Sequence, residues 1–174
     1  MSRRQTRWTN RSRRQAFWAC LVGALSAGCG SSQSTATAPK SDAEASNEER
    51  ECLEQANGEH PRKPDEPLRI GLRHILVRHA DSTRADASIT RTRGQACLRA
   101  REALRALESG TEWDEAVARY SDEKGAATRH GSLGSLTRDD LDPAFADAAF
   151  ELEPDQVSYV VETPAGFHVI LRVD

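Results

Sequence analysis

The segment Arg73-His74-Ile75-Leu76-Val77 places one histidine inside a short apolar run, and Gly166-Phe167-His168-Val169-Ile170 places a second in a similar run. Short apolar runs rich in β-branched residues predict β-strands. The two segments lie near the ends of one stretch of about 100 residues, a length typical of a single domain. We therefore expect two neighbouring strands that hold two imidazoles side by side.

The sequence around these segments predicts an α+β domain. We expect strands over Leu68–Val77, Val157–Thr163 and Phe167–Val173, with the last two joined by a short hairpin at Pro164-Ala165-Gly166. Between the first strand and this hairpin the apolar spacing changes to that of helices.

Three helices are predicted in that central part. The first runs from Thr90 to Glu108, has small or apolar residues on one face and ends at Gly110. The second is shorter, with Thr111 as its expected N-cap. The third begins at Asp142-Pro143, because proline is favoured at the first helical position.

Three further segments lie between the two histidines: Tyr120-Ser121-Asp122-Glu123, His130-Gly131-Ser132-Leu133-Gly134 and Asp142-Pro143-Ala144-Phe145. In this order and spacing the chain resembles the parvulin family of peptidyl-prolyl cis/trans isomerases. The resemblance covers residues 70–174 and implies a domain over 68–174. It also implies a four-stranded antiparallel sheet surrounded by three to four helices, with the Leu133-Gly134 region as the extra short strand or turn.

The resemblance implies an activity and a set of site residues, with no cofactor and no metal. The activity is isomerisation of X-Pro bonds. The two histidines would face each other in a hydrogen-bonded network with a threonine and a serine, which are here Thr163 and Ser121. From the residues alone, the same network is equally suited to stiffening the sheet without taking part in the chemistry.

A pocket for the proline ring is implied at Leu133, Leu141 and Phe145, which on their own residue types are also core candidates. Glu123 stands where the family usually carries Cys or Asp, facing the substrate carbonyl. Asp122 is an alternative for that position, because the loop is about one residue longer than in close relatives. A third interpretation is that Glu123 is an exposed loop acid.

Arg78 and Arg84 match two basic positions of the parvulin branch that recognises phosphorylated Ser or Thr before proline. The third position holds Thr83, and Asp81 and Asp86 dilute the positive charge. We expect a mild preference for acidic or phosphorylated residues before proline. The alternative is a solvated loop without a binding role.

The first 28 residues have the pattern of a secretory signal. Six arginines within residues 3–14 precede a short apolar run, and Ser26-Ala27-Gly28-Cys29 resembles a bacterial lipobox with Ser26 in place of the usual leucine. This predicts removal of residues 1–28 and acylation of Cys29, with palmitate among the attached lipids. A cleaved protein without lipid and an uncleaved anchor remain as alternatives.

Residues 29–67 are predicted to form a disordered acidic linker, within which a short helix over Asn47–Ala56 is possible. Loss of residues 1–28 removes six arginines and no acidic residue, so the formal charge changes from −3 to −9. Such a charge makes nucleic acid an unsuitable partner. Cys52 and Cys97 would then lie in an oxidising compartment, either as buried free thiols or as a disulfide.

Together these patterns predict a peptidyl-prolyl isomerase of the bacterial cell envelope that assists the folding of proline-containing clients. The alternative is a catalytically weak parvulin domain that acts as a chaperone or binds proline-rich segments. We expect a monomer, attached to the membrane by lipid and exposed to the periplasm or the cell surface. Gly30 after the acylated cysteine favours the outer membrane over the inner one.

Overall fold

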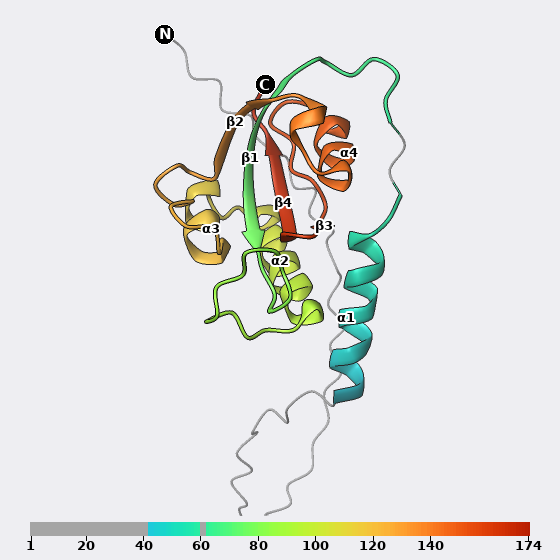
Figure 1. Cartoon of the computed structure of the whole chain (residues 1–174), viewed down its shortest axis with the longest axis vertical. Coiled ribbons are helices and arrows are strands. Elements are labelled where there is room, and N and C mark those ends of the chain that lie inside the picture. The colour runs from blue at the N-terminus through green and yellow to red at the C-terminus, as the bar shows by residue number, and fades with distance from the viewer. Residues whose placement is uncertain (1–41, 60–61) are drawn as a thin grey trace, which may run out of the picture. The chain divides into compact units, whose positions relative to one another are not determined.

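The computed structural model describes residues 42–59 and 62–174 (Figure 1). The predicted signal peptide, Cys29 and the first part of the linker lie outside the described residues. No helix among the described residues has both the length and the apolarity that a membrane span requires. The elements, in chain order, are α1 (Asp42–Ala56), β1 (Ile70–Val77), α2 (Arg93–Glu108), α3 (Trp113–Tyr120), β2 (Ser132–Leu136), the 3₁₀ turn η1 (Arg138–Asp140), α4 (Pro143–Glu151), β3 (Val161–Thr163) and β4 (Gly166–Arg172).

The four strands form one antiparallel sheet in the order β2-β1-β4-β3. The first and last predicted strands are thus hydrogen-bonded neighbours in its centre. In their register Leu76 lies opposite His168, and His74 lies opposite Ile170. Because side chains alternate between faces, this register puts both histidines on one face of the sheet, as diagonal neighbours. The predicted α+β class with a four-stranded antiparallel sheet is confirmed.

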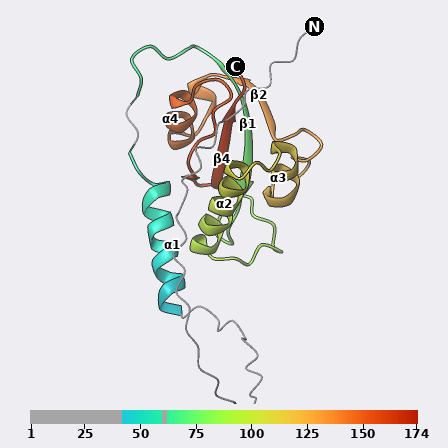
Figure 2. The same cartoon turned by 180° about the vertical axis from the view of Figure 1, so that it is seen from behind.

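Two hydrophobic clusters divide the core between the faces of the sheet. Ile75, Val77, Phe167 and Val169 point to one face, where they pack with α1, α2 and α3. The alternate residues of β1 and β4 pack with α4 on the other face, together with Val161 of β3. Figure 2 shows α2 and α3 on the near side of the sheet. The histidines face the α4 side, so α4 is the helix that shapes their surroundings.

The ends of the helices follow local capping chemistry. Thr92 and Gln95 form a capping box at the start of α2. Asp142 caps α4 by accepting from the Ala144 amide, with Pro143 at the first helical position as predicted. The expected N-cap at Thr111 is wrong: α3 begins after Glu112. The Thr111 amide is instead used to close α2, where it donates to the carbonyl of Ala106.

The predicted strand over Val157–Thr163 is shorter in the structure. Only Val161–Thr163 pair as a ladder, and Val157 makes one isolated bridge to Leu171. The reason is Ser158, whose hydroxyl accepts from the amide of Ile170 while its own amide donates to the Ile170 carbonyl. A side chain thus takes the place of a backbone partner of β4 and interrupts the ladder.

The possible helix at Asn47–Ala56 is confirmed as part of α1, so the prediction of disorder is wrong for this segment of the linker. This helix packs on α2 and carries Cys52, which is buried and disulfide-bonded to Cys97 of α2. Just beyond its end, the Asn57 side chain donates to Glu162 of β3 at 2.6 Å. Polar composition alone favours disorder, but a cross-link and a buried apolar stripe at Cys52 and Ala56 hold this helix in place.

The Cys52–Cys97 disulfide is expected to contribute strongly to stability. It closes a loop with a sequence separation of 45 residues, for which chain-entropy arguments give about 2–4 kcal/mol. Reduction should therefore lower the denaturant midpoint of the protein, as measured by far-UV circular dichroism. The Cys52→Ser/Cys97→Ser variant should show the same lower midpoint without reductant and no further change with it. An unchanged midpoint in this variant would contradict the prediction.

Candidate active site

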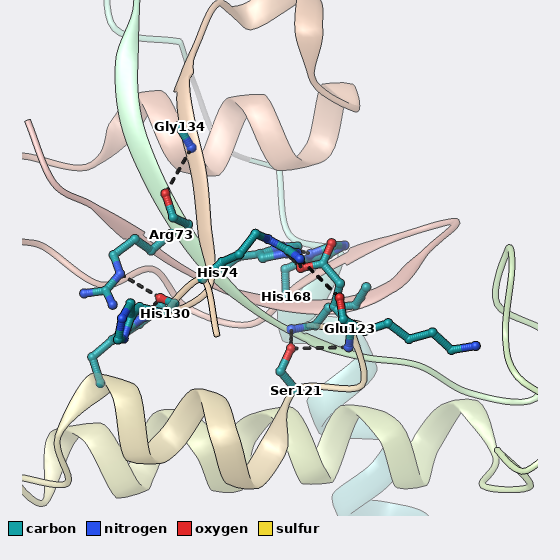
Figure 3. Close-up of polar contacts among 12 residues, drawn as sticks. Arg73, His74, Ser121, Glu123, His130, Gly134 and His168 are labelled. Atoms are coloured by element: carbon teal, nitrogen blue, oxygen red, sulfur yellow. Dashed lines mark hydrogen bonds and ion pairs between the residues drawn. The ribbon is translucent and has the colours of Figure 1, made fainter. Parts of the chain in front are cut away.

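Two buried imidazoles form the centre of the candidate site (Figure 3). His74 of β1 and His168 of β4 are each 5 % exposed, and their Nδ1 atoms lie 3.2 Å apart. The rings are stacked, with centroids 5.3 Å apart and planes at 22°. Their diagonal position on one face of the sheet explains this approach, and it confirms that the two predicted strands hold the histidines side by side.

The outer nitrogen of each imidazole has its own partner. His168 Nε2 lies 2.8 Å from the Thr163 hydroxyl, which in turn accepts from the Ala165 amide at 3.1 Å. His74 Nε2 lies 3.2 Å from Glu123 Oε2. The result is one continuous chain of hydrogen bonds from the β3–β4 hairpin to the loop after α3.

The charge states of His168 and Glu123 decide which groups donate along this chain of hydrogen bonds. Burial lowers the pKa of His168 well below its usual range, and the neighbouring His74 and Arg78 lower it further. The hydrogen bond with His74 lowers the pKa of Glu123, and the charges of His74 and Arg129 add to this against the opposing effect of partial burial. Near neutral pH, therefore, His168 is neutral and Glu123 is an anion that can only accept.

An accepting Glu123 requires His74 Nε2 to be the donor, and where His74 carries a single N–H only one order of donors remains. His74 donates from Nε2 to the carboxylate, so its Nδ1 accepts from His168 Nδ1–H. His168 Nε2 then accepts from the Thr163 hydroxyl. A neutral imidazole carries a single N–H, so each bond fixes the next. The carboxylate thereby determines the tautomer of both histidines.

The structure distinguishes Glu123 from its neighbour Asp122. The Asp122 carboxylate accepts from the backbone amide of Arg78 at 2.8 Å and from the guanidinium of Arg91. It fastens two loops together and is not the acid that contacts the histidines. Glu123 occupies that place, 26 % exposed at the side chain, so it is neither fully buried nor a free loop acid.

Ser121 lies beside the network without extending it. Its hydroxyl accepts from the amides of Leu76 and Glu123, at 3.3 and 3.5 Å (Figure 3). The resemblance suggested a hydrogen-bonded group of two histidines, a threonine and a serine. The geometry instead joins Thr163 to His168 and uses Ser121 to position the backbone of Glu123 against β1.

The loop that carries Glu123 returns to β1 at Gly131. The His74 amide donates to the Gly131 carbonyl at 2.8 Å. Gly131 has φ of +70°, and a Cβ there would lie 2.5 Å from the His74 carbonyl oxygen. Only glycine suits such an approach. The backbone of His74 is consequently fixed by the same loop whose carboxylate contacts its side chain.

Phe145 gives the site its apolar side. Its ring meets His168 edge-on, with centroids 5.0 Å apart and planes at 88°, and its centroid lies 6.0 Å from that of His74. Phe145 is buried in the cluster beneath α4, against which Leu133 and Leu141 pack while partly exposed. The structure thus brings the three predicted pocket residues into one cluster, whose member Phe145 lies against the imidazoles.

A hollow lies beside Glu123, between the loop after β1 and the loop after α3. It has a volume of about 420 Å³ and its lining includes Arg78, Arg84, Asp86 and Lys124. Arg78 is not free to bind a ligand with its full fork, because Nη1 donates to the carbonyls of Thr83 and Arg84 at 2.8 and 3.0 Å. Arg78 therefore stabilises the conformation of the loop after β1.

One residue that contacts the network was not predicted from the sequence. Arg129 donates from Nη2 to Glu123 Oε2 at 2.8 Å. The two residues are six positions apart in a loop, where no helical or strand period relates them. A sequence signal is therefore absent, apart from the presence of an acid and a base in one loop.

Stability should depend on pH through His168. Its folded pKa lies below the ordinary value of 6.5, so the unfolded chain binds a proton more readily. Stability is therefore complete above about pH 6.5 and is lost as pH falls below it, by about 1 kcal/mol at pH 5.5. Urea midpoints at pH 7.5 and 5.5 should show this loss, and the His168→Gln variant should lose less between the two values. An equal loss in the variant would contradict it.

Comparison of the sequence with known proteins identifies the family that it matches. The model of the rotamase family, described as a PPIC-type PPIase domain, matches residues 74–174. Peptidyl-prolyl cis-trans isomerase pin1 of Schizosaccharomyces pombe is 35% identical over 116 residues, which are 64% of this chain and 66% of that protein. The putative peptidyl-prolyl cis-trans isomerase dodo of Drosophila melanogaster is 36% identical over 128 residues, 70% of this chain and 76% of that protein. Foldase protein PrsA of Halalkalibacterium halodurans is 40% identical over 75 residues, 43% of this chain and 22% of the foldase.

Solved structures agree with these matches. The isomerase Ess1 from Candida albicans superposes with a TM-score of 0.56 at 26% identity, covering 76% of this chain and 77% of that one. The PPIase domain of TbPar42 gives 0.52 at 29% identity, over 60% of this chain and 99% of that domain. The paired histidines, the sheet order and the family match over residues 74–174 lead to one conclusion: this chain belongs to the PPIC-type peptidyl-prolyl cis-trans isomerases, the parvulins.

Proposed function

We propose that residues 68–174 isomerise X-Pro bonds in proline-containing polypeptides of the cell envelope and so assist their folding. The observation that carries this proposal is the contact of an apolar ring, Phe145, with the ordered chain of His168, His74 and Glu123. Such a site offers a proline ring an apolar surface and offers the preceding carbonyl a polar, partly dehydrated one.

The chemistry requires no nucleophile, because isomerisation breaks no covalent bond. The barrier of ~18–20 kcal/mol comes from amide resonance, which is lost as the bond twists. An apolar surface at Phe145, Leu133 and Leu141 holds the proline ring away from water. A carboxylate at Glu123 disfavours the charge-separated resonance form of the amide, and its effect is larger where water is excluded. The role of the imidazoles is to hold Glu123 in that position.

Location in the cell envelope is supported by two independent features. The predicted lipobox ends at Cys29, and the Cys52–Cys97 disulfide is of a kind that persists in oxidising compartments. We propose a lipid-anchored protein with its domain in the periplasm or at the cell surface. Intact-mass analysis of the exported protein tests this anchor: an unmodified Cys29 would exclude it.

A chaperone without strong isomerase activity is the second candidate. The relatives include proteins named foldase PrsA and chaperone SurA, although this chain covers only 22% of each. Here the apolar cluster would bind proline-rich segments without accelerating their isomerisation. A protease-coupled assay with X-Pro peptides separates the two functions, because a binder lowers the amount of free peptide but leaves the rate of isomerisation unchanged.

Phe145→Ala should reduce kcat/KM for an Ala-Pro peptide at least tenfold, which corresponds to about 1.4 kcal/mol of transition-state binding. The reason is the loss of the apolar surface beside His168. Because Phe145 is also buried in the core, folding must be measured at the assay temperature, and Phe145→Leu serves as the milder variant. Full activity in a folded Phe145→Ala protein would place the proline site elsewhere.

A mild preference for negative charge before proline is expected. Arg84 lines the hollow beside Glu123, while Arg78 is engaged with loop carbonyls and Lys124 pairs with Asp86 at 3.5 Å. Glu-Pro and pSer-Pro peptides should be favoured over Ala-Pro by about two- to tenfold, since exposed charge pairs contribute little. The preference should shrink with added salt.

Arg84→Ala should remove most of this preference. Arg78→Ala should in addition lower the stability of the loop, because its bonds to Thr83 and Arg84 are lost. A hundredfold preference for pSer-Pro would show that the hollow is a dedicated phosphate site. No preference, and no change in Arg84→Ala, would leave the loop without a role in recognition.

A further inference from the structure

The Glu123 carboxylate has two hydrogen-bonding partners on the same oxygen. Oε2 lies 3.2 Å from His74 Nε2 and 2.8 Å from Arg129 Nη2. The shorter contact is the one to Arg129. Lys124, the other nearby cation of the loop, has a side chain that is 91% exposed and pairs with Asp86. Arg129 is thus the cation that Glu123 contacts directly.

The backbone of the loop presents Arg129 to Glu123 in a fixed way. Arg129 N–H donates to the carbonyl of Gly125 at 3.2 Å, and its own carbonyl accepts from Ser132 at 2.9 Å. Its Nη1 donates to the Lys124 carbonyl at 3.2 Å. The guanidinium therefore folds back across the loop, with one nitrogen on the backbone and the other on the carboxylate.

The length of Glu123 explains why a second anchor is needed. A glutamate has one more rotatable bond than an aspartate, and holding it in one rotamer costs more side-chain entropy. The Glu123 side chain is 26% exposed, so it has room to turn toward solvent. A single bond from His74 at 3.2 Å leaves that freedom, whereas a second, shorter bond from the Arg129 guanidinium restricts it.

We propose that Arg129 is a positioning residue of the isomerase site, which holds the Glu123 carboxylate against His74 and so maintains one order of hydrogen bonds through both histidines. This inference rests on the proposed function for its effect on rate, but its effect on the tautomers is independent of any activity. Without Arg129 the carboxylate leaves His74 for part of the time. The opposite order, with His74 Nδ1–H donating to His168, then becomes accessible.

The test combines isomerase assays with ¹⁵N NMR of the histidine rings, on the full exported chain at pH 7.5. In the unsubstituted protein His74 should carry its hydrogen on Nε2 and His168 on Nδ1. Arg129→Ala should give a mixture of both orders and a three- to tenfold lower kcat, with KM within about twofold. Arg129→Lys should retain most of the rate and the original tautomers, because it keeps a charge in reach of the carboxylate.

Two controls separate positioning from a general effect of charge or stability. Arg119→Ala removes an equally charged surface residue that pairs with Glu102, and it should change neither rate nor tautomers. In a Glu123→Gln background, Arg129→Ala should have no further effect on kcat, since the pair that couples them is already gone. If Arg129→Ala does not fold, Arg129→Gln replaces it, because it keeps most of the side-chain length without the charge.

The outcomes are distinct. Unchanged tautomers and rate in folded Arg129→Ala would overturn the inference, and so would a loss of the same size in the Glu123→Gln background. An unsubstituted protein without isomerase activity would overturn the proposed function alone. In that case the tautomer measurement would still decide whether Arg129 positions Glu123.

Discussion

The register between β1 and β4 is the constraint on which the rest of the structure depends. It places Leu76 opposite His168 and His74 opposite Ile170, so that both imidazoles project from one face. A slip of one residue would turn every side chain of a strand to the other face. If β1 slipped, His74 would enter the cluster under α2, and Ile75 and Val77 would both face α4. Core and site are therefore fixed by the same ladder.

The site depends on electrostatics as much as on packing. Two neutral imidazoles in contact have no preferred order of donors, and a hydroxyl such as that of Thr163 accepts either arrangement. A carboxylate removes this ambiguity, since it accepts only. Glu123 is one methylene longer than an aspartate, and its carboxylate also accepts from Arg129 of the same loop. The proposed positioning role of Arg129 would limit the additional freedom of this longer side chain.

Helix α1 packs on the face of the sheet opposite to the histidines and helps to hold β3 in place. Its disulfide fastens it to α2, and Asn57 beyond its end donates to Glu162 of β3. Arg93 also binds this carboxylate with two nitrogens. Burial would raise the pKa of Glu162, but these hydrogen bonds outweigh it and the pKa is lowered. The next residue, Thr163, is the one that contacts His168. The short edge strand β3 is thus held by its ladder with β4 and by the hydrogen bonds of Asn57 and Arg93 to Glu162.

The sequence by itself determined the elements whose signals are local. Short apolar runs rich in β-branched residues predicted the strands of His74 and His168, and Asp142-Pro143 predicted the start of α4. The resemblance to the parvulins, which rests on the order and spacing of the segments, implied that both histidines and Phe145 belong to one site. Contacts between residues distant in sequence decided the rest. From the sequence, the helix at Asn47–Ala56 and the Cys52–Cys97 disulfide were only possibilities, because the contacts that hold α1 on α2 are properties of the fold. Only the tertiary structure showed the partners of the loop residues: Asp122 binds Arg91, Ser121 binds backbone amides, and Arg129 binds Glu123. Loops have no period from which such partners can be predicted.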